Sequence, residues 1–258
     1  MSGTQFAGQE QIEGHNHVAG EERYWRDLAP TQERSWRETK AHLVRGLERL
    51  LLSEPVAGNV LEIGAGLGWA SAILKRHRPD ANVTETDVSP SVFQLAAATH
   101  AEIGAAPDHS SVCDMERLPF ADESFDLVFG VAVLHHADDV AAVMREVRRV
   151  LKPGGRYFGM DEFAAAPALR GFWRDSRFSP FARRHGELDV QEAVYTLREW
   201  QSAVRDGGFT DARVAMNRDW RLKRSEGGRR WYFFLTSPLP DAVFAKLPGA
   251  SIVILARK

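Results

Sequence analysis

The stretch "VLEIGAGLG", residues 60–68, places three glycines within five positions directly after a short apolar run. A glycine turn that follows a strand lets backbone N–H groups approach an anionic or zwitterionic ligand closely. The turn therefore predicts a strand–turn–helix unit, and the residues around it decide which ligand it would hold.

Downstream of this turn, segments with strand and helix patterns alternate. Strands separated by helices of this length predict a parallel sheet covered on both faces, which is the α/β class. The expected strands occupy residues 60–63, 82–86, 109–113, 125–131 and 156–160, with 211–216 and 251–256 as the last candidates. The expected helices occupy residues 69–74, Ser89-Pro90 to Gly104, Asp138 or Asp139 to the "LKPGG" break at 151–155, and a capping box at Thr196 to Gly207.

The composition is that of an ordinary globular protein. The 258 residues are 44% hydrophobic and 26% charged, and the formal net charge of -2 gives no general reason to expect a polyanion partner. No apolar run reaches the roughly 18 residues of a membrane helix, and the first residues lack the pattern of a secretory signal. Cys113 is the only cysteine, which excludes an internal disulfide and a cysteine-based metal site. We therefore expect a cytoplasmic protein with no membrane partner.

Two common ligands of glycine turns fit the neighbouring residues poorly. A triphosphate-binding loop needs Lys and then Ser or Thr directly after its last glycine, whereas Trp69 and Ala70 follow Gly68. The dinucleotide fingerprint G-x-G-x-x-G is one residue wider than the spacing found here.

Acidic residues near the turn favour a ligand that carries both a cation and an adenosine. Glu62 lies two residues before the first glycine, where a carboxylate would repel a pyrophosphate and attract the ammonium group of S-adenosylmethionine. The carboxylate of that ligand could use the helix N-terminus. Asp87, at the end of the second expected strand, can accept both ribose hydroxyls. The alternatives are a solvated strand-end charge for Glu62 and a helix cap for Asp87.

The segment "CDMERLPF", residues 113–120, follows the third expected strand. Asp114 can accept a hydrogen bond from an adenine amino group there. Met115 can offer its backbone N–H to the edge of the ring and its apolar side chain to the face. The segment is thus suited to adenine, which is consistent with a ribose at Asp87.

Four segments in order, "VLEIGAGLG", "ETDVSP", "CDMERLPFADESFDLVFGVAVLHH" and "EVRRVLKPGGRYF", resemble the class I S-adenosylmethionine-dependent methyltransferases. The resemblance covers about residues 58–162 and is closest to the bacterial branch that modifies small molecules and lipids. It implies S-adenosylmethionine as cofactor and S-adenosylhomocysteine as product. It also implies a Rossmann-like, seven-stranded, mostly parallel sheet with helices on both faces and an antiparallel last strand, which residues 251–256 suit.

The resemblance also implies cofactor contacts position by position. The glycine turn would hold the methionine end, the second strand the ribose, and the segment after the third strand the adenine. The end of the fourth strand would touch the cofactor through its backbone. In that order the residues are Glu62, Gly64, Ala65, Gly66 and Gly68; Asp87 and Val88; Asp114 and Met115; and Val131.

Further segments are expected around this core. We predict an N-terminal arm and lid helices at residues 1–54 and a cofactor-binding core at 55–162. A cap insertion with a helix would follow at 163–210, and strands at 211–258 would complete the sheet. Residues 217–250, between the last two strands, depart from the family pattern and form an insertion without an assigned role.

The candidate catalytic residues follow the fourth and fifth strands. A hydroxyl nucleophile benefits from a general base, and His135 or His136 is the candidate; the other histidine would shape the loop. Asp161 and Glu162 lie just past the fifth strand and could orient a substrate. An amine or carbanion acceptor could react by proximity without a base.

The N-terminal stretch offers two further candidate sites. Tyr24 and Trp25 fit a lid that closes over the cofactor and substrate. His15 and His17, with Glu13 and Glu21 nearby, suggest metal ligands, but we expect no metal in so polar a stretch.

Residues 166–230 carry a local excess of positive charge. They contain fourteen Lys and Arg against nine Asp and Glu, and Arg170 and Arg174 lie among aromatic residues. This predicts either a cap that favours an acidic or aromatic substrate or a solvated basic face.

The expected function is methyl transfer to a hydroxyl oxygen of a small molecule, such as a sugar, polyketide, aromatic or acidic metabolite. N- or C-methylation and methylation of a nucleic acid stay open as alternatives. The sequence VAVLHH after the fourth strand argues against nucleic acid, because it lacks the Asn/Asp-Pro-Pro-aromatic pattern of enzymes that methylate exocyclic base amines. An NAD-dependent oxidoreductase and a catalytically silent cofactor-binding partner fit the motifs less well. Monomer and homodimer are both compatible with the sequence.

Overall fold

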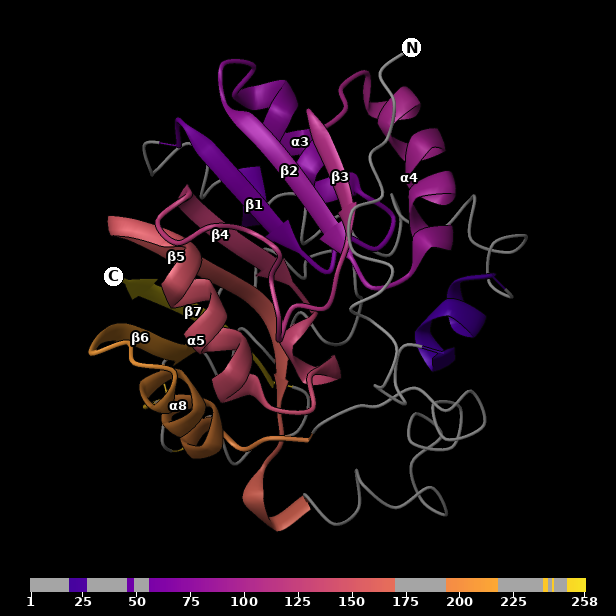
Figure 1. The fold of residues 1–258 in the computed structure, drawn as a ribbon. Coiled ribbons are helices and arrows are strands. Elements are labelled where there is room, and N and C mark those ends of the chain that lie inside the picture. Colours follow the sequence, from indigo (N-terminus) through magenta and orange to yellow (C-terminus); the bar gives the residue numbers. More distant parts are fainter. Residues whose placement is uncertain are drawn as a thin grey trace.

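A seven-stranded sheet in the order β3-β2-β1-β4-β5-β7-β6 organises the protein (Figure 1). The strands are β1 (Asn59–Ile63), β2 (Asn82–Asp87), β3 (His109–Val112), β4 (Phe125–Val131), β5 (Leu151–Ala164), β6 (Asp211–Met216) and β7 (Ala250–Arg257). The fold is that of a computed structural model, which describes residues 19–26, 46–48, 56–169, 194–217, 239–240, 243 and 250–258.

The strand directions place the site at one edge of this sheet. Neighbouring strands from β3 to β5 are parallel, whereas β7 is antiparallel to both β5 and β6. The predicted mostly parallel, Rossmann-like sheet with an antiparallel last strand is confirmed. The chain runs outward from β1 to β3 and then returns to β4 on the other side of β1. In open α/β sheets, ligands bind at the carboxyl ends of the strands beside such a reversal.

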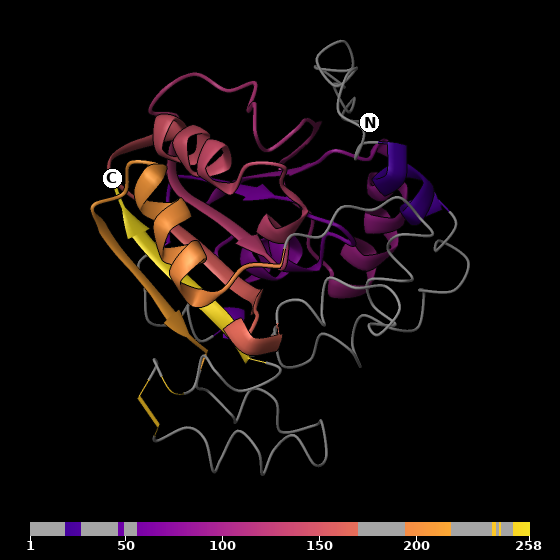
Figure 2. The same cartoon turned by 90° about the horizontal axis from the view of Figure 1, so that it is seen from below.

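Helices cover both faces of the sheet (Figure 2). The helix α3 (Trp69–His77) packs beside α4 (Pro90–Ile103), and α5 (Val140–Val150) packs beside α8 (Leu197–Asp206) on the opposite face. Short 3-10 helices, η2 (Leu134–His136) and η3 (Pro167–Leu169), follow β4 and β5. Residues 19–26 are also helical. None of the helices in these described ranges is both long and apolar enough to cross a membrane.

Side-chain caps that the sequence predicted fix the starts of α5 and α8. Asp139 caps α5 by accepting a hydrogen bond from the N–H of Ala141 at 2.8 Å. Thr196 and Glu199 form the predicted capping box of α8. The buried side of α5 carries Val140, Val143, Val147 and Val150, at the spacing of one helix face. These valines join a core cluster between α5, α8 and the sheet, and a second cluster lies under α3.

The strand β5 is longer at both ends than residues 156–160, so that prediction was wrong. It begins at Leu151 directly after α5, because the "LKPGG" segment turns into extended backbone that pairs with Phe125. It continues to Ala164 through a bulge at Asp161, whose φ is +64°. Asp161 and Glu162 therefore lie within the strand rather than past its end. Pairing with β7, about ninety residues later in the chain, holds this extension in place.

Several predicted segments fall outside the described residues. They include most of the N-terminal arm and lid helices, residues 170–193 of the predicted cap, and most of the 217–250 insertion. Leu47, in the short described stretch 46–48, is buried in the core cluster under α3.

Candidate cofactor and active site

The glycine loop connects β1 to α3 in a tight, left-handed course. Gly64 and Gly66 have φ values of +63° and +52°, a region that side chains with a Cβ rarely adopt. A Cβ on Gly64 would lie 2.0 Å from Cγ2 of Val133, so the loop also packs directly against the segment after β4. Ala65 N donates to the Thr86 carbonyl oxygen at 2.8 Å, which fixes the loop across the end of β2.

Glu62 lies beneath this loop and is only 2% exposed. Its Oε2 accepts hydrogen bonds from the hydroxyl and, at 3.0 Å, from the backbone N–H of Ser71 in the first turns of α3. Burial raises the pKa of Glu62 well above its ordinary value, and the nearby carboxylates of Glu85 and Asp87 raise it further. The alternative of a solvated strand-end charge is therefore wrong.

Asp87 ends β2 and joins two parts of the candidate site. Its Oδ2 accepts a hydrogen bond from Gly66 N at 2.9 Å, and its Oδ1 accepts one from Ser89 N at 3.0 Å. Burial raises the pKa of Asp87 to about 6, although both backbone N–H groups favour the ionised form. The carboxylate thus orders the glycine loop and the start of α4 together.

The segment after β3 lies beside Asp87. Cys113 N donates to the Asp87 carbonyl oxygen at 3.0 Å, and Oδ1 of Asp114 accepts from Glu116 N at 2.8 Å. Met115 is half-buried and packs against the core. Val131 is half-buried at the end of β4, and Val88 is half-buried after β2. We call residues 62–68, 87–91, 113–115 and 131 the cofactor cradle, since the structure brings all of these predicted cofactor residues to one edge of the sheet.

Glu162 organises the loop that carries the two histidines. It is fully buried. Its Oε1 accepts from the N–H groups of Val133 and Leu134 at 2.8 and 2.9 Å, and its Oε2 lies 2.8 Å from Nδ1 of His135. The predicted substrate-orienting role of Glu162 does not fit this geometry, because a buried carboxylate engaged by the loop faces no substrate. Its neighbour Asp161 is half-buried at the bulge.

His136 lies next to His135 but has a different acidic partner. The two rings lie 4.2 Å apart between centroids, and Nδ1 of His136 is 3.0 Å from Oε1 of Glu21. The side chain of His136 is 26% exposed, against 15% for His135. Both Glu21 and His136 are close enough to Asp87 to change its pKa, the carboxylate raising it and the imidazole lowering it. His136 therefore lies beside the cofactor cradle.

The helical segment 19–26 lies beside this edge of the sheet, next to the start of α4 (indigo in Figure 1). Ring carbons of Trp25 lie 3.2 and 3.3 Å from the position that a Cβ on Gly66 would take, and Tyr24 packs edge-on against Trp25. The sequence predicted these two aromatic residues as a lid but missed contacts of Glu21 and Glu22. Nothing in local periodicity indicates contacts between residues so far apart in the chain.

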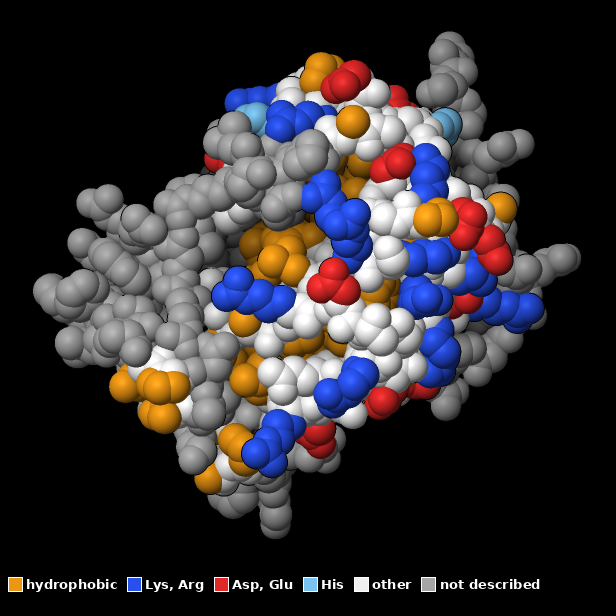
Figure 3. Space-filling model, turned by 90° about the vertical axis from the view of Figure 1, so that its left-hand side faces the viewer, with side chains coloured by type: hydrophobic (Ala, Val, Ile, Leu, Met, Phe, Trp, Pro, Cys, Tyr) orange, Lys and Arg blue, Asp and Glu red, His pale blue; other side chains and the backbone are white. Residues whose placement is uncertain are grey.

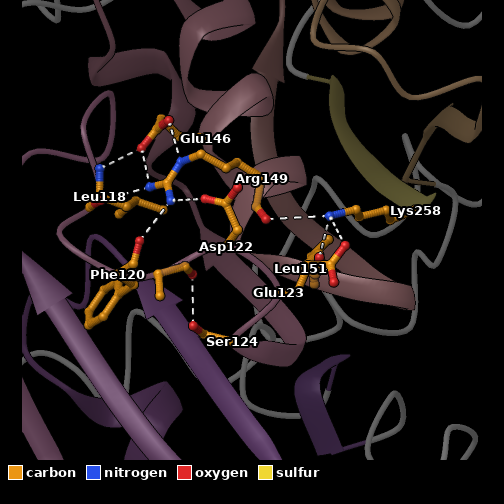
Figure 4. Close-up of polar contacts among 10 residues, drawn as sticks. Leu118, Phe120, Asp122, Glu123, Ser124, Glu146, Arg149, Leu151 and Lys258 are labelled. Atoms are coloured by element: carbon orange, nitrogen blue, oxygen red, sulfur yellow. Dashed lines mark hydrogen bonds and ion pairs between the residues drawn. The ribbon is translucent and has the colours of Figure 1, made fainter.

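An ion-pair network holds residues 118–123, which lie between β3 and β4, against α5 (Figure 4). Arg149 of α5 donates to the carbonyl oxygens of Leu118 and Phe120 at 2.8 and 2.7 Å and pairs with Glu146 and Asp122. Lys258 pairs with Glu123 near the start of β4. On the side of the molecule where the parallel strands begin, basic and acidic side chains are interspersed (Figure 3). That charge pattern is typical of a solvated surface.

The remaining candidate residues fall outside the part of the chain that the structure describes. Arg170 and Arg174, His15, His17 and Glu13 all lie outside it. Among the residues that are described, no three His, Cys, Asp or Glu side chains are grouped so that they could hold a metal ion.

The residues present fit S-adenosylmethionine. The glycine loop at the N-terminus of α3 is suited to the amino-acid end, and the Gly66 position, which has no Cβ, lies directly under the Trp25 ring. Asp87 offers a carboxylate at the same edge, and Asp114 follows Cys113, whose N–H is bonded to the Asp87 carbonyl oxygen.

Comparison with known proteins agrees with this fit. Residues 61–159 match the family model described as a methyltransferase domain. The 27-O-demethylrifamycin SV methyltransferase of Amycolatopsis mediterranei is 32% identical over 205 residues, covering 78% of this chain and 68% of that protein. The ubiquinone/menaquinone biosynthesis C-methyltransferase UbiE of Desulfotalea psychrophila is 40% identical over 108 residues. That alignment covers 42% of this chain and 43% of UbiE, so the chain matches less than half of that relative's length.

A solved structure shows the same fold. The geranyl diphosphate C-methyltransferase from Streptomyces coelicolor A3(2) superposes with a TM-score of 0.61 at 16% identity, covering 95% of this chain and 98% of that chain. The strand order, the cradle and the match to the rifamycin enzyme lead to one conclusion. The chain belongs to the class I S-adenosylmethionine-dependent methyltransferases, with S-adenosylmethionine as its cofactor.

Proposed function

We propose that this protein transfers a methyl group to a hydroxyl oxygen of a small molecule and that His136 is the general base. The observation that supports this most directly is the position of His136. Its ring is the more exposed of the two histidines, lies beside the cofactor cradle and has Nδ1 at 3.0 Å from a carboxylate. A carboxylate at Nδ1 favours the tautomer in which Nε2 can accept a proton.

The cofactor cradle has separate tasks in this proposal. The methionine part would be held by Glu62, Gly64, Ala65, Gly66 and Gly68. The ribose part would be held by Asp87 and Val88, and the adenine part by Asp114 and Met115. Val131 contributes backbone contacts. When bound, S-adenosylmethionine supplies an electrophilic methyl group on a sulfonium centre.

The chain's own residues position the acceptor and move its proton. His136 takes the proton of the acceptor hydroxyl at Nε2, and the Glu21 carboxylate stabilises the imidazolium that forms. His135, held by Glu162, shapes the loop on which His136 lies. The residues proposed to contact the substrate are Tyr24, Trp25, Asp161, Arg170 and Arg174. The lid would exclude water from the substrate.

The proposed division of the chain follows from these tasks. Residues 1–54 would supply the lid and 55–162 the cofactor core. Residues 163–210 would form the substrate cap, and 211–258 would complete the sheet around the 217–250 insertion.

Oxygen is favoured as the acceptor because a hydroxyl must lose its proton, and an imidazole paired with a carboxylate can act as the base that removes it. The rifamycin relative is named for O-methylation, which agrees with this proposal. UbiE, at 40% identity over a shorter region, is a C-methyltransferase and makes carbon the second candidate.

Two measurements test the proposal. Isothermal titration should show binding of S-adenosylmethionine and not of NAD. Transfer of a labelled methyl group should then be assayed on 27-O-demethylrifamycin SV and on a prenylated quinol, and NMR of the product should show a methoxy group. A C-methyl product would overturn the assignment of oxygen.

Variants of the two histidines test the base. His136→Ala should lower kcat by roughly 100-fold or more while the cofactor Kd stays unchanged. His135→Ala is the matched variant, and it should mainly lower stability, because its ring bonds to a buried carboxylate that holds the loop. Unchanged kcat in His136→Ala would remove that residue as the base.

A further inference from the structure

The helical segment 19–26 makes three separate contacts with functional parts of the site. One contact is to the start of α4, one to the glycine loop and one to His136. These parts are far apart in the chain and meet only at the carboxyl edge of the sheet. A single short segment that touches all three can link cofactor binding to the base.

The first contact is a helix cap supplied from outside the helix. Ser89 is the N-cap residue of α4, but its side chain makes no capping bond within its own helix. Instead Glu22 accepts hydrogen bonds from the hydroxyls of Ser89 and Ser91 and, at 3.3 Å, from Ser91 N. A carboxylate at a helix N-terminus is stabilised by the helix dipole, so this contact anchors the segment.

The second contact covers the glycine loop. The Trp25 ring lies against Gly66, and no side chain larger than hydrogen would fit at that position without moving the ring. Gly66 is also the residue whose N–H is bonded to Asp87. The ring therefore lies on the part of the loop that is tied to the proposed ribose ligand.

The third contact gives His136 its carboxylate. Glu21 is buried and lies one residue before the anchoring Glu22. Its Oε1 lies 3.0 Å from Nδ1 of His136. By contrast, the carboxylate that contacts His135 belongs to Glu162 of β5, within the sheet.

We infer that Glu21 is a positioning residue for His136 and that it acts only when segment 19–26 is docked on the cofactor cradle. The inference rests on the proposed function, in which His136 is the base. Docking through Glu22 and Trp25 brings the Glu21 carboxylate to Nδ1. His136 then takes the hydroxyl proton at Nε2, the electron pair of the broken O–H bond stays on the acceptor oxygen, and Glu21 remains ionised beside the imidazolium.

Three titratable groups surround the His136 ring and must be considered together. Glu21 faces it from segment 19–26, His135 lies beside it on η2, and Asp87 lies near it at the end of β2. Glu21 is the only one of these three supplied by segment 19–26. A change confined to Glu21 therefore reports on docking of that segment.

NMR titration of the His136 ring tests the contact without any substrate. The midpoint should move to lower pH by about one unit or more in Glu21→Gln, because a carboxylate that favours the imidazolium is lost. Arg23→Gln is the matched control, since Arg23 is an exposed residue of the same segment. An unchanged His136 midpoint in Glu21→Gln would overturn the inference.

Steady-state kinetics test whether the contact between Glu21 and His136 contributes to catalysis. Glu21→Gln should lower kcat roughly tenfold or more and move the acidic side of the kcat–pH profile to lower pH, with the cofactor Kd within about twofold of wild type. Glu21→Asp should recover part of kcat. Trp25→Ala should lower both kcat and cofactor affinity, because it weakens docking itself.

The result for His136→Ala separates this inference from the proposed function. If His136→Ala loses kcat and Glu21→Gln does not, the base assignment stands and the positioning role of Glu21 is wrong. If His136→Ala keeps wild-type kcat, the base assignment fails, whatever the NMR titration of Glu21→Gln shows.

Discussion

Asp87 combines burial with two backbone hydrogen bonds, and burial decides how pH acts on this carboxyl group. Its pKa is raised from 3.8 to about 6 because burial disfavours the charged form. The folded state therefore binds a proton more tightly than the unfolded state. The contribution to stability is fully present below pH 4 and is lost as pH rises through about 6.

We predict opposite pH effects on stability and on cofactor binding. Without cofactor, the free energy of unfolding of wild type relative to Asp87→Asn should fall by at most about 3 kcal/mol between pH 4 and pH 7. S-adenosylmethionine should bind more weakly as pH falls below about 6, because a protonated carboxyl cannot accept from both ribose hydroxyls. Urea unfolding and isothermal titration across this range measure the two trends. A cofactor affinity in wild type that is independent of pH, as expected for Asp87→Asn, would contradict the ribose assignment.

Gly64 is predicted to tolerate no side chain, for a reason beyond its backbone angles. Gly64→Ala would add a Cβ at 2.0 Å from Cγ2 of Val133, which pushes the glycine loop against the segment before the histidines. Gly104→Ala is the matched control, because Gly104 has φ +77° and nothing within 4 Å of the added Cβ. The control should cost only the backbone strain, about 1–2 kcal/mol.

Gly64→Ala should cost clearly more than this control and should also weaken cofactor binding. Urea unfolding and titration of both variants with S-adenosylmethionine measure the difference. Equal losses of stability in the two variants would show that the clash with Val133 does not affect stability.

At the scale of elements, the loop after β4 owes its shape to the strand next to it. Glu162 of β5 accepts hydrogen bonds from three successive backbone N–H groups, those of Val133, Leu134 and His135. Such buried N–H groups would otherwise be unsatisfied, which is costly in a buried loop. Glu162 directly follows the bulge at Asp161.

We predict that Glu162→Ala lowers the free energy of unfolding by several kcal/mol, since each buried donor left without an acceptor costs about 1–3 kcal/mol. Glu162→Gln keeps one acceptor oxygen and should fall between this variant and wild type. Asp161→Asn is the control, because Asn tolerates a positive φ and keeps the bulge. Urea unfolding measures all three, and a loss below about 1 kcal/mol in Glu162→Ala would contradict this role.

The elements that sequence could predict are those with a local signal. The strand at residues 125–131 and the cap at Thr196 were predicted correctly, and Asp139 is one of the two caps predicted for α5. Apolar runs and capping side chains act within a few residues, so their signal is local. The extension of β5 could not be predicted, since it depends on pairing with β7 far along the chain. The carboxylate partners of His135 and His136 could not be predicted for the same reason, because Glu162 and Glu21 reach these rings only through tertiary packing.

At the scale of the whole molecule, the sheet reversal gathers the cofactor cradle from four strands, so opening any one of them disturbs the site. The reactivity of Cys113 can be used to measure such opening, because Cys113 is the only cysteine of the sequence and is only 6% exposed. It lies between the proposed ribose and adenine residues, with its N–H bonded to the Asp87 carbonyl oxygen. Burial raises the pKa of its thiol to about 12. The native thiol is therefore both covered and protonated at neutral pH.

We predict that a thiol reagent such as DTNB reacts with Cys113 only when the structure opens. Labelling at pH 8 should be slow in the folded protein and fast in urea. If a local opening of the cradle exposes the thiol, S-adenosylmethionine at 100 times its Kd should slow labelling about 100-fold, because the cofactor binds only the closed form. Cys113→Ala gives the background of the assay. Fast labelling of the folded protein that S-adenosylmethionine does not slow would show that Cys113 is exposed independently of the cofactor cradle.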